Sequence, residues 1–292
     1  RGLMAYSNPQ HLISTEALSE AMSQNGANLR IFDVTVTLVP NPPGYKAVSG
    51  IEDYGNGHIP GTAFMDLGKD LSDTTSGLGF TLPSAEYLQA AYRAAGIDDD
   101  SQVVFYSSGH MMWATRAWWM LYSCGHKQVA VLDGGLEKWK AENRDLSMNA
   151  GSYTAGQMRV NLDAERWVNK EQTAAAIEDG GICTINALAP GVYSGEADMH
   201  YGRRGHIENS KNLYYDTMMQ EGCFKPAEDL RQNFEESGVW GTPRVIAYCG
   251  GGISATIDAM ALTLIGHDNV AIYDGSMSEW VKDESLPLIT GS

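Results

Sequence analysis

Two stretches of this sequence repeat one another and decide its fold. Residues 125–139 read GHKQVAVLDGGLEKW and residues 266–280 read GHDNVAIYDGSMSEW, so GH, VA, DG and the final W each recur 141 residues later. The tripeptide GHI also recurs in the same order, at 57–59 and 205–207. Chance does not keep both order and spacing over such distances, so the sequence predicts a tandem duplication.

Each copy alternates short apolar runs with segments of helical periodicity. The first copy has strand-like runs at 29–34, 103–106 and 129–132, and helical spacing at 84–95 and 114–124. The second copy repeats the pattern, in order at 182–185, 227–237, 245–248, 254–265 and 270–273. This alternation predicts an α/β fold of two tandem domains, each a mostly parallel sheet flanked by helices on both faces.

The repeat also divides the chain. We expect an N-terminal domain over 8–147, a linker over 148–165 and a C-terminal domain over 166–290. The linker lacks a sustained hydrophobic period and contains Gly151, Ser152, Gly156 and Asn161. It is long enough to strap across both domains.

Composition excludes several classes of function. Acidic residues number 36 and basic residues 20, which gives a net charge of −16. A field of this sign repels nucleic acids and anionic membrane surfaces. No apolar run reaches the roughly 18–20 residues of a membrane-spanning helix. We expect a cytoplasmic protein, or a periplasmic one whose leader has been removed.

One loop carries a chemical signature. Residues 249–255 read CGGGISA, directly between the apolar strand 245–248 and a helical segment. Glycines at a helix N-terminus let several backbone N–H groups converge on an anion. Such a cradle favours the thiolate of Cys249 and can hold a second sulfur as a persulfide. A tight turn around a buried cysteine is the alternative, but it needs fewer glycines. The predicted cradle comprises Gly250, Gly251, Gly252, Ile253 and Ser254.

The matching loop of the first copy lacks this chemistry. Residues 106–113 read YSSGHMMW, with Ser107 at the position of Cys249 and bulky residues in place of glycines. We therefore expect the N-terminal domain to be catalytically inactive, with its loop on the opposite wall of a cleft. Cys124 and Cys183 lie in apolar runs, which predicts buried free thiols. Histidines and cysteines show no metal-ligand spacing, so we expect neither a metal ion nor an organic cofactor.

Together these residues resemble the two-domain rhodanese-type sulfurtransferases, the family of thiosulfate and 3-mercaptopyruvate sulfurtransferases. Besides the Cys249 loop, the resemblance rests on GHIPG at 57–61, RAWWM at 116–120, LDGG at 132–135, DG at 274–275 and EW at 279–280. It implies that Cys249 takes a sulfane sulfur from a small anionic donor and becomes a persulfide. The sulfur then passes to a thiol, cyanide or a protein acceptor.

Substrate-binding residues are less clearly marked, because the chain departs from its family. The loop after Cys249 has no cation of the kind that the thiosulfate branch carries. Residues 186–195 lack the arginines that hold the substrate carboxylate in the mercaptopyruvate branch. The nearest basic pair is Arg203 and Arg204, which we predict to hold the donor's anion, because a guanidinium can grip a carboxylate through two parallel hydrogen bonds. Two solvated loop arginines are the alternative.

Three further side chains are candidates for the cleft. Arg116 could line it or form an interdomain salt bridge. His58 could protonate a leaving enolate, but its recurrence as His206 favours a structural role. His110 could reach the cleft from its loop.

Two other functions compete with sulfur transfer. A cysteine phosphatase needs an arginine six residues after its cysteine, and here that position is Ala255. A non-catalytic or regulatory persulfide carrier of rhodanese-like fold is the stronger alternative, because the family's substrate cations are missing. If the protein is an enzyme, the amide-only loop favours 3-mercaptopyruvate or a similar organic donor over the doubly charged thiosulfate.

Overall fold

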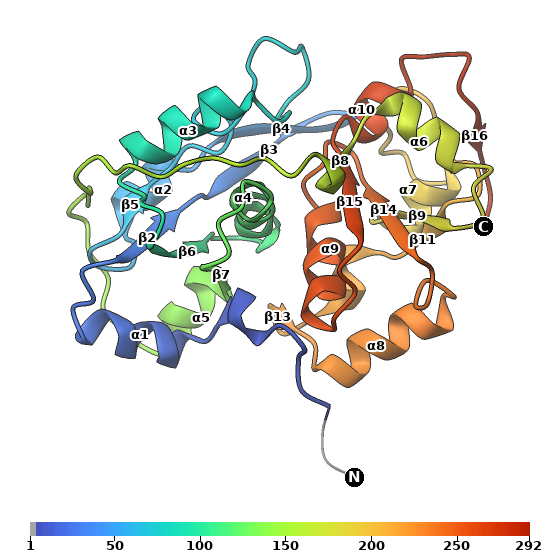
Figure 1. Cartoon of the computed structure of the whole chain (residues 1–292). Coiled ribbons are helices and arrows are strands. Elements are labelled where there is room, and N and C mark those ends of the chain that lie inside the picture. The colour runs from blue at the N-terminus through green and yellow to red at the C-terminus, as the bar shows by residue number, and fades with distance from the viewer. Residues whose placement is uncertain (1–3) are drawn as a thin grey trace.

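The computed structural model describes residues 4–292 and contains two five-stranded sheets (Figure 1). All neighbouring strands within each sheet run parallel. The first sheet has the order β1 (Leu12–Ile13), β7 (Val129–Leu132), β6 (Gln102–Tyr106), β2 (Leu29–Asp33), β5 (Ala63–Phe64). The second has the corresponding order β8 (Trp167–Val168), β15 (Val270–Tyr273), β14 (Arg244–Tyr248), β9 (Ile182–Asn186), β11 (Lys211–Asn212). The predicted α/β fold of two tandem domains is confirmed.

Helices flank both sheets. In the first half they are α1 (Thr15–Ser23), α2 (Ile51–Asn56), α3 (Ala85–Ala94), α4 (Met112–Ser123) and α5 (Gly135–Ala141). In the second they are α6 (Lys170–Ala176), α7 (Pro190–Ser194), α8 (Ala227–Glu236), α9 (Ala255–Leu264) and α10 (Ser276–Trp280). The apolar helices α4 and α9 are buried almost throughout, and they pack against each other between the two sheets (Figure 1).

Smaller elements complete the chain. Three antiparallel pairs are formed by β3 (Val36–Asn41) with β4 (Gly44–Ser49), β10 (His206–Ile207) with β16 (Leu288–Ile289), and β12 (Met219–Gln220) with β13 (Cys223–Phe224). Single 3₁₀ turns are η1 (Pro9–His11), η2 (Ala164–Arg166) and η3 (Tyr215–Met218). The β3–β4 hairpin has no counterpart in the second half.

An irregular segment connects the halves, where the sequence predicts a linker. It runs along the outside of the first half before it reaches β8 (Figure 1). Its backbone N–H groups at Gly156, Met158 and Asn161 donate to carbonyls of Arg93, Ile97 and Cys124. The segment is therefore fastened to the first half along its length.

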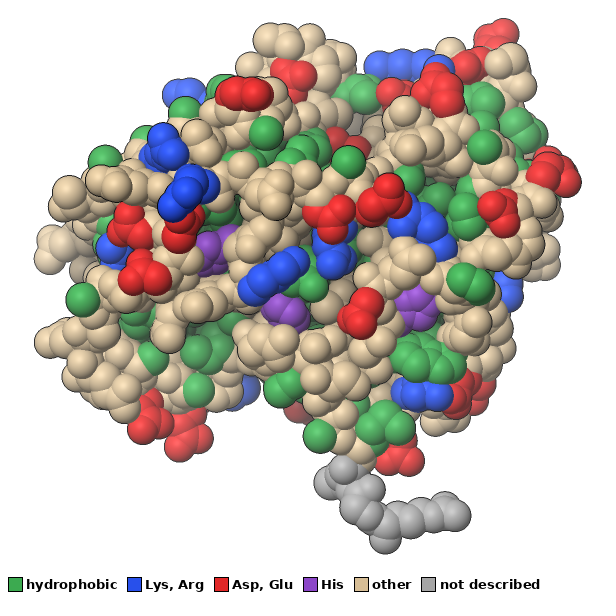
Figure 2. Space-filling view, in the orientation of Figure 1, with side chains coloured by type: hydrophobic (Ala, Val, Ile, Leu, Met, Phe, Trp, Pro, Cys, Tyr) green, Lys and Arg blue, Asp and Glu red, His purple; other side chains and the backbone are tan. Residues whose placement is uncertain are grey.

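The surface carries charges of both signs. On the face in Figure 2, Lys and Arg side chains are interspersed with Asp and Glu, and no continuous basic patch forms there. Within residues 4–292, no helix combines the length and apolarity that crossing a bilayer requires.

Candidate active site

Cys249 stands at the carboxyl end of β14, the central strand of the second sheet. Ligand sites of open parallel sheets lie at this end of the strands. The Cys249 N–H donates to Ser276 Oγ at 3.1 Å, and its carbonyl accepts from Met277 N at 3.0 Å. The residue is only 1% exposed. Its backbone is thus fixed by the start of α10, and its thiol lies within the protein.

The loop after Cys249 leaves its amides free. In the described chain, no acceptor pairs with the backbone N–H groups of residues 250–255, which lead into the first turn of α9. Successive free N–H groups at the start of a helix present a partial positive charge. The loop is therefore suited to bind a negatively charged sulfur.

Two of the three glycines are required by their neighbours. A Cβ on Gly250 would lie 2.1 Å from Tyr201 Oη. Gly252 has a φ of +80°, and a Cβ there would lie 2.8 Å from the Asp274 carbonyl oxygen. A Cβ on Gly251 would meet nothing within 4 Å. The middle glycine thus faces open space, where a substrate has room.

Arg116 ties the first half to this loop. Its side chain is fully buried, and Nη1 donates to Asp274 Oδ1 at 2.6 Å and to the Gly252 carbonyl at 3.1 Å. Nη2 donates to the Phe80 carbonyl. Of the two roles open to Arg116 from the sequence, the structure shows the interdomain salt bridge. Because Asp274 neutralises the guanidinium, Arg116 supports the loop and is not a free cation for a substrate.

Three titratable side chains that sequence reasoning missed are affected by the charge of Cys249. Burial raises the pKa of the Tyr201 and Tyr215 phenols, and the negative charge of the Cys249 thiolate raises both further. Burial likewise raises the pKa of Asp258 well above its usual range, with the Cys249 charge as the second cause. Tyr201 and Tyr215 remain neutral donors near the sulfur, and Asp258 is a neutral acid.

Both halves of the chain match a known protein family. A family profile described as rhodanese-like domain matches residues 14–142 and 193–283. The chain belongs to the rhodanese-like sulfurtransferases. It is 32% identical over 248 residues to the 3-mercaptopyruvate sulfurtransferase of Escherichia coli (strain K12), covering 84% of this chain and 88% of that protein. It is 30% identical over 277 residues to the thiosulfate sulfurtransferase of Cricetulus griseus, covering 92% and 91%.

Solved structures agree with this assignment. The crystal structure of the 3-mercaptopyruvate sulfotransferase SseA from Escherichia coli superposes with a TM-score of 0.80 at 29% identity, over 92% of this chain and 99% of that one. The complex of EanB with hercynine has a TM-score of 0.85 at 18% identity, over 98% and 70%, and shows the shared fold alone.

In this sulfurtransferase, the guanidinium of Arg203 is bound to the C-terminal segment of the chain. Its guanidinium donates to backbone carbonyls of the C-terminal segment, at distances of 2.9 to 3.3 Å, namely those of Trp280, Val281, Asp283 and Leu286. These bonds leave one Nη1 hydrogen without a partner, so Arg203 cannot grip a carboxylate through two parallel hydrogen bonds, and the structure contradicts its predicted anion-holding role. Arg204 is exposed, and only its Nη1 is engaged, by the carbonyls of Gly195 and Ala197. Arg204 therefore stays a candidate for holding the donor's anion.

His58, one of the two histidines predicted for the cleft, is buried inside the first half. His58 is fully buried and stacked on Tyr54 at 3.7 Å, with ring nitrogens 2.7 Å and 2.9 Å from the carbonyls of Tyr54 and Asn149. His206 repeats this stack on Tyr193 at 3.6 Å. The structure therefore contradicts His58 as a proton donor to substrate and supports its structural role.

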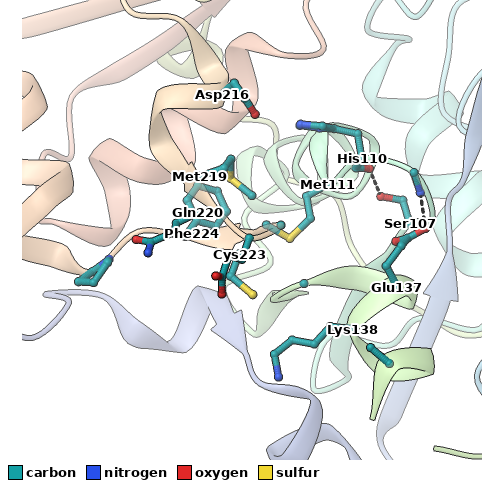
Figure 3. A pocket seen from close by; sticks show the side chains of 16 residues that line it. Ser107, His110, Met111, Glu137, Lys138, Asp216, Met219, Gln220, Cys223 and Phe224 are labelled. Carbon is teal, nitrogen blue, oxygen red and sulfur yellow. Dashed lines mark hydrogen bonds between the residues drawn. The ribbon is translucent and has the colours of Figure 1, made fainter. Parts of the chain in front are cut away.

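His110 lies nearer to the site. Its ring packs edge-on against Tyr215 at 5.0 Å, and Nδ1 accepts from Met112 N. Burial lowers its pKa, so it is neutral near pH 7. It also lines a cavity of about 780 Å³ between the two halves, where Figure 3 shows it with Met111 and Cys223.

The loop of the first copy already holds a carboxylate. Glu137 Oε1 accepts from Gly109 N at 2.7 Å (Figure 3). It also accepts from Ser108 Oγ at 2.7 Å. The amide of Ser108 is taken by Thr35 Oγ1. These amides are therefore occupied, unlike those after Cys249, and the inactivity of the first copy stays a prediction.

The remaining cysteines carry no assigned role. Cys124 and Cys183 are buried free thiols, which confirms the prediction, and Cys223 is free and half-buried. Within residues 4–292, no group of three or more His, Cys, Asp or Glu side chains could hold a metal ion.

Proposed function

We propose that this sulfurtransferase uses 3-mercaptopyruvate, or a similar organic donor, in preference to thiosulfate, and carries the sulfur as a persulfide on Cys249. The observation that carries the proposal is the charge of the site. The loop after Cys249 has unpaired backbone amides, and the phenols of Tyr201 and Tyr215 are neutral. The Arg116 guanidinium beside the loop is neutralised by Asp274. A doubly charged donor needs cations more than a donor with a single carboxylate does.

The reaction follows from these groups. The Cys249 thiolate attacks the sulfur of 3-mercaptopyruvate, and the sulfur–carbon bond breaks. The enolate that leaves takes up the proton of the donor's thiol and becomes pyruvate. The negative charge then rests on the outer sulfur of the persulfide, beside the amides of residues 250–255. An acceptor thiolate or cyanide attacks that outer sulfur and releases the Cys249 thiolate.

The names of relatives support the choice of donor. Besides the Escherichia coli protein, a probable 3-mercaptopyruvate sulfurtransferase of Pseudomonas aeruginosa is 33% identical over 288 residues, covering 96% of this chain and 98% of that one. Within this chain, Arg204 is the remaining candidate for the carboxylate.

The test compares kcat/KM for 3-mercaptopyruvate and thiosulfate, with cyanide as acceptor. We expect a higher value for 3-mercaptopyruvate, and an added sulfur on the intact protein after donor treatment that Cys249→Ser lacks. Cys223→Ser is the matched control and should load sulfur normally. Faster thiosulfate turnover would overturn the donor assignment. Loading without turnover of either donor would favour the persulfide carrier instead.

A further inference from the structure

Asp258 is the most unusual side chain in the second half. It lies in α9, one turn after the Cys249 loop, and is fully buried. Its neighbours along the helix are apolar and equally buried, among them Ile257, Ala259 and Leu262. Side chains on a helix point back toward its N-terminus, so the carboxyl of Asp258 lies over the first turn of α9, beside the loop.

Neither carboxyl oxygen of Asp258 has a hydrogen-bond partner in the described chain. The unpaired amides of residues 250–255 lead into the first turn of the same helix, and an ionised carboxylate within their reach would bind them. The first copy shows that outcome, since Glu137 binds the Gly109 amide. An ionised carboxylate buried without partners is very costly, so Asp258 is held as the neutral acid and the amides stay free.

The neutral carboxyl of Asp258 has an O–H group that can donate a hydrogen bond, but it has no acceptor in the described chain. An anionic sulfur on Cys249 is an acceptor of the kind that this O–H group lacks. We propose that Asp258 is a catalytic residue for sulfur transfer, whose carboxyl O–H donates a hydrogen bond to the anionic sulfur carried by Cys249. The inference rests on the proposed function and deepens it. The amides and this acid together hold the outer sulfur, and the site carries a single negative charge. Hydrogen bonds to charged acceptors are about twice as strong as neutral ones.

Among the carboxylic acids on α9 and on the elements packed against it, Asp258 is the fully buried one. Helix α9 packs against α4, α8, η3, β14 and β15. Arg116 of α4 is paired with Asp274, and burial raises the pKa of Tyr215, Tyr248 and Tyr273, which therefore stay neutral. The other charged or titratable side chains on these elements are Tyr122, Asp216, Glu228, Asp229, Arg231, Glu235, Glu236 and Arg244, all exposed or half-buried.

The experiment compares Asp258→Leu, which cannot donate, with Asp258→Asn, which keeps a neutral donor of similar shape. Both are made in a Cys223→Ser background, which removes the half-buried thiol and leaves three buried cysteines. The first readout is the lifetime of the persulfide by intact mass. The second is the pH midpoint of Cys249 alkylation by iodoacetamide, located by peptide mapping.

We expect Asp258→Leu to shorten the persulfide lifetime about tenfold and to raise the alkylation midpoint by about one pH unit. Asp258→Asn should shorten the lifetime two- to threefold, roughly, because an amide donates a weaker bond. Leucine and asparagine variants that match the parent in both readouts would overturn the proposal, even if their melting temperatures change. If the leucine variant does not fold, an unchanged lifetime in Asp258→Asn overturns it alone. Alkylation needs no sulfur donor, so this arm tests Asp258 even where the proposed function fails.

Discussion

The hydroxyl oxygens of Thr115 and Thr256 lie 2.8 Å apart, at the contact between α4 and α9. The two residues are 141 positions apart, the spacing of the sequence repeat, so they are the same position of the two copies. A residue that meets its own counterpart marks an approximate twofold axis between the halves. The site is therefore built where the duplicated units face each other.

The same symmetry is seen in two backbone contacts. Leu82 N donates to Asp274 Oδ2 at 2.6 Å, and Phe224 N donates to Asp133 Oδ1 at 3.0 Å. Each half thus reaches into the loop region of the other. Among residues 4–292, an arginine joins the contact at Asp274 and not at Asp133, and Asp274 is on the side on which Cys249 lies.

Arg116→Ala is predicted to destabilise the protein strongly. It removes one partner of a buried ion pair and leaves the Gly252 and Phe80 carbonyls without their donor. We expect a loss of roughly 3–5 kcal/mol in the free energy of unfolding, measured by urea denaturation. Arg159→Ala is the control, because its pair with Asp99 is exposed and is worth about 0–1 kcal/mol. Equal losses in the two variants would contradict this role of Arg116.

Gly250→Ala and Gly251→Ala form a matched pair within the loop. The new Cβ of the first would collide with the Tyr201 hydroxyl, whereas that of the second enters open space. We expect Gly250→Ala to lower kcat/KM at least tenfold, about 1.4 kcal/mol, and Gly251→Ala to change it less than threefold. Similar kinetics in the two variants would show that Tyr201 does not hold this loop in place.

Much of this architecture could be predicted from the sequence. Strands β6, β7, β14 and β15 are short apolar runs, and their repetition gives both the fold and the pairing of the halves. The Cys249 loop is local in sequence, so its residues suffice to predict it. The β3–β4 hairpin escaped prediction, because it is only partly buried and has no second copy to reveal it.

The surroundings of Cys249 were harder to predict, since they are formed by tertiary contacts. Tyr201 reaches Gly250 from a loop nearly 50 residues earlier, and Arg203 meets carbonyls about 80 residues later. No local pattern encodes such distances. Asp258 did leave a signal, because it is the one charged residue within the apolar run of α9.

Arg203→Ala and Arg204→Ala should now behave differently. Loss of Arg203 removes hydrogen bonds to four carbonyls, so we expect about 2–4 kcal/mol less stability and an unchanged KM in the folded fraction. Loss of the exposed Arg204 should leave stability within about 0.5 kcal/mol and raise the KM for 3-mercaptopyruvate about tenfold. Steady-state kinetics and urea denaturation of both variants provide the check. A KM unchanged in Arg204→Ala would remove it as the carboxylate anchor.

The buried histidines should contribute less stability as the solution becomes mildly acidic. Burial lowers the pKa of His11, His126 and His206 in the folded protein, while in the unfolded chain each titrates near its usual value of about 6.5. Below that pH the unfolded chain binds protons that the folded protein refuses, so the free energy of unfolding decreases. Buried Asp258, Asp133 and Asp33 act in the opposite direction, because burial raises their pKa and the folded protein takes up protons that the unfolded chain does not. The histidine contribution is therefore measured as a difference between two proteins. His126→Gln, whose amide can still donate to the Ser101 carbonyl, lacks one titrating ring. By urea denaturation, the stability of the wild type relative to His126→Gln should fall between about pH 7.5 and 5.5. A difference that stays constant over this range would mean that His126 binds protons equally well in the folded and unfolded states.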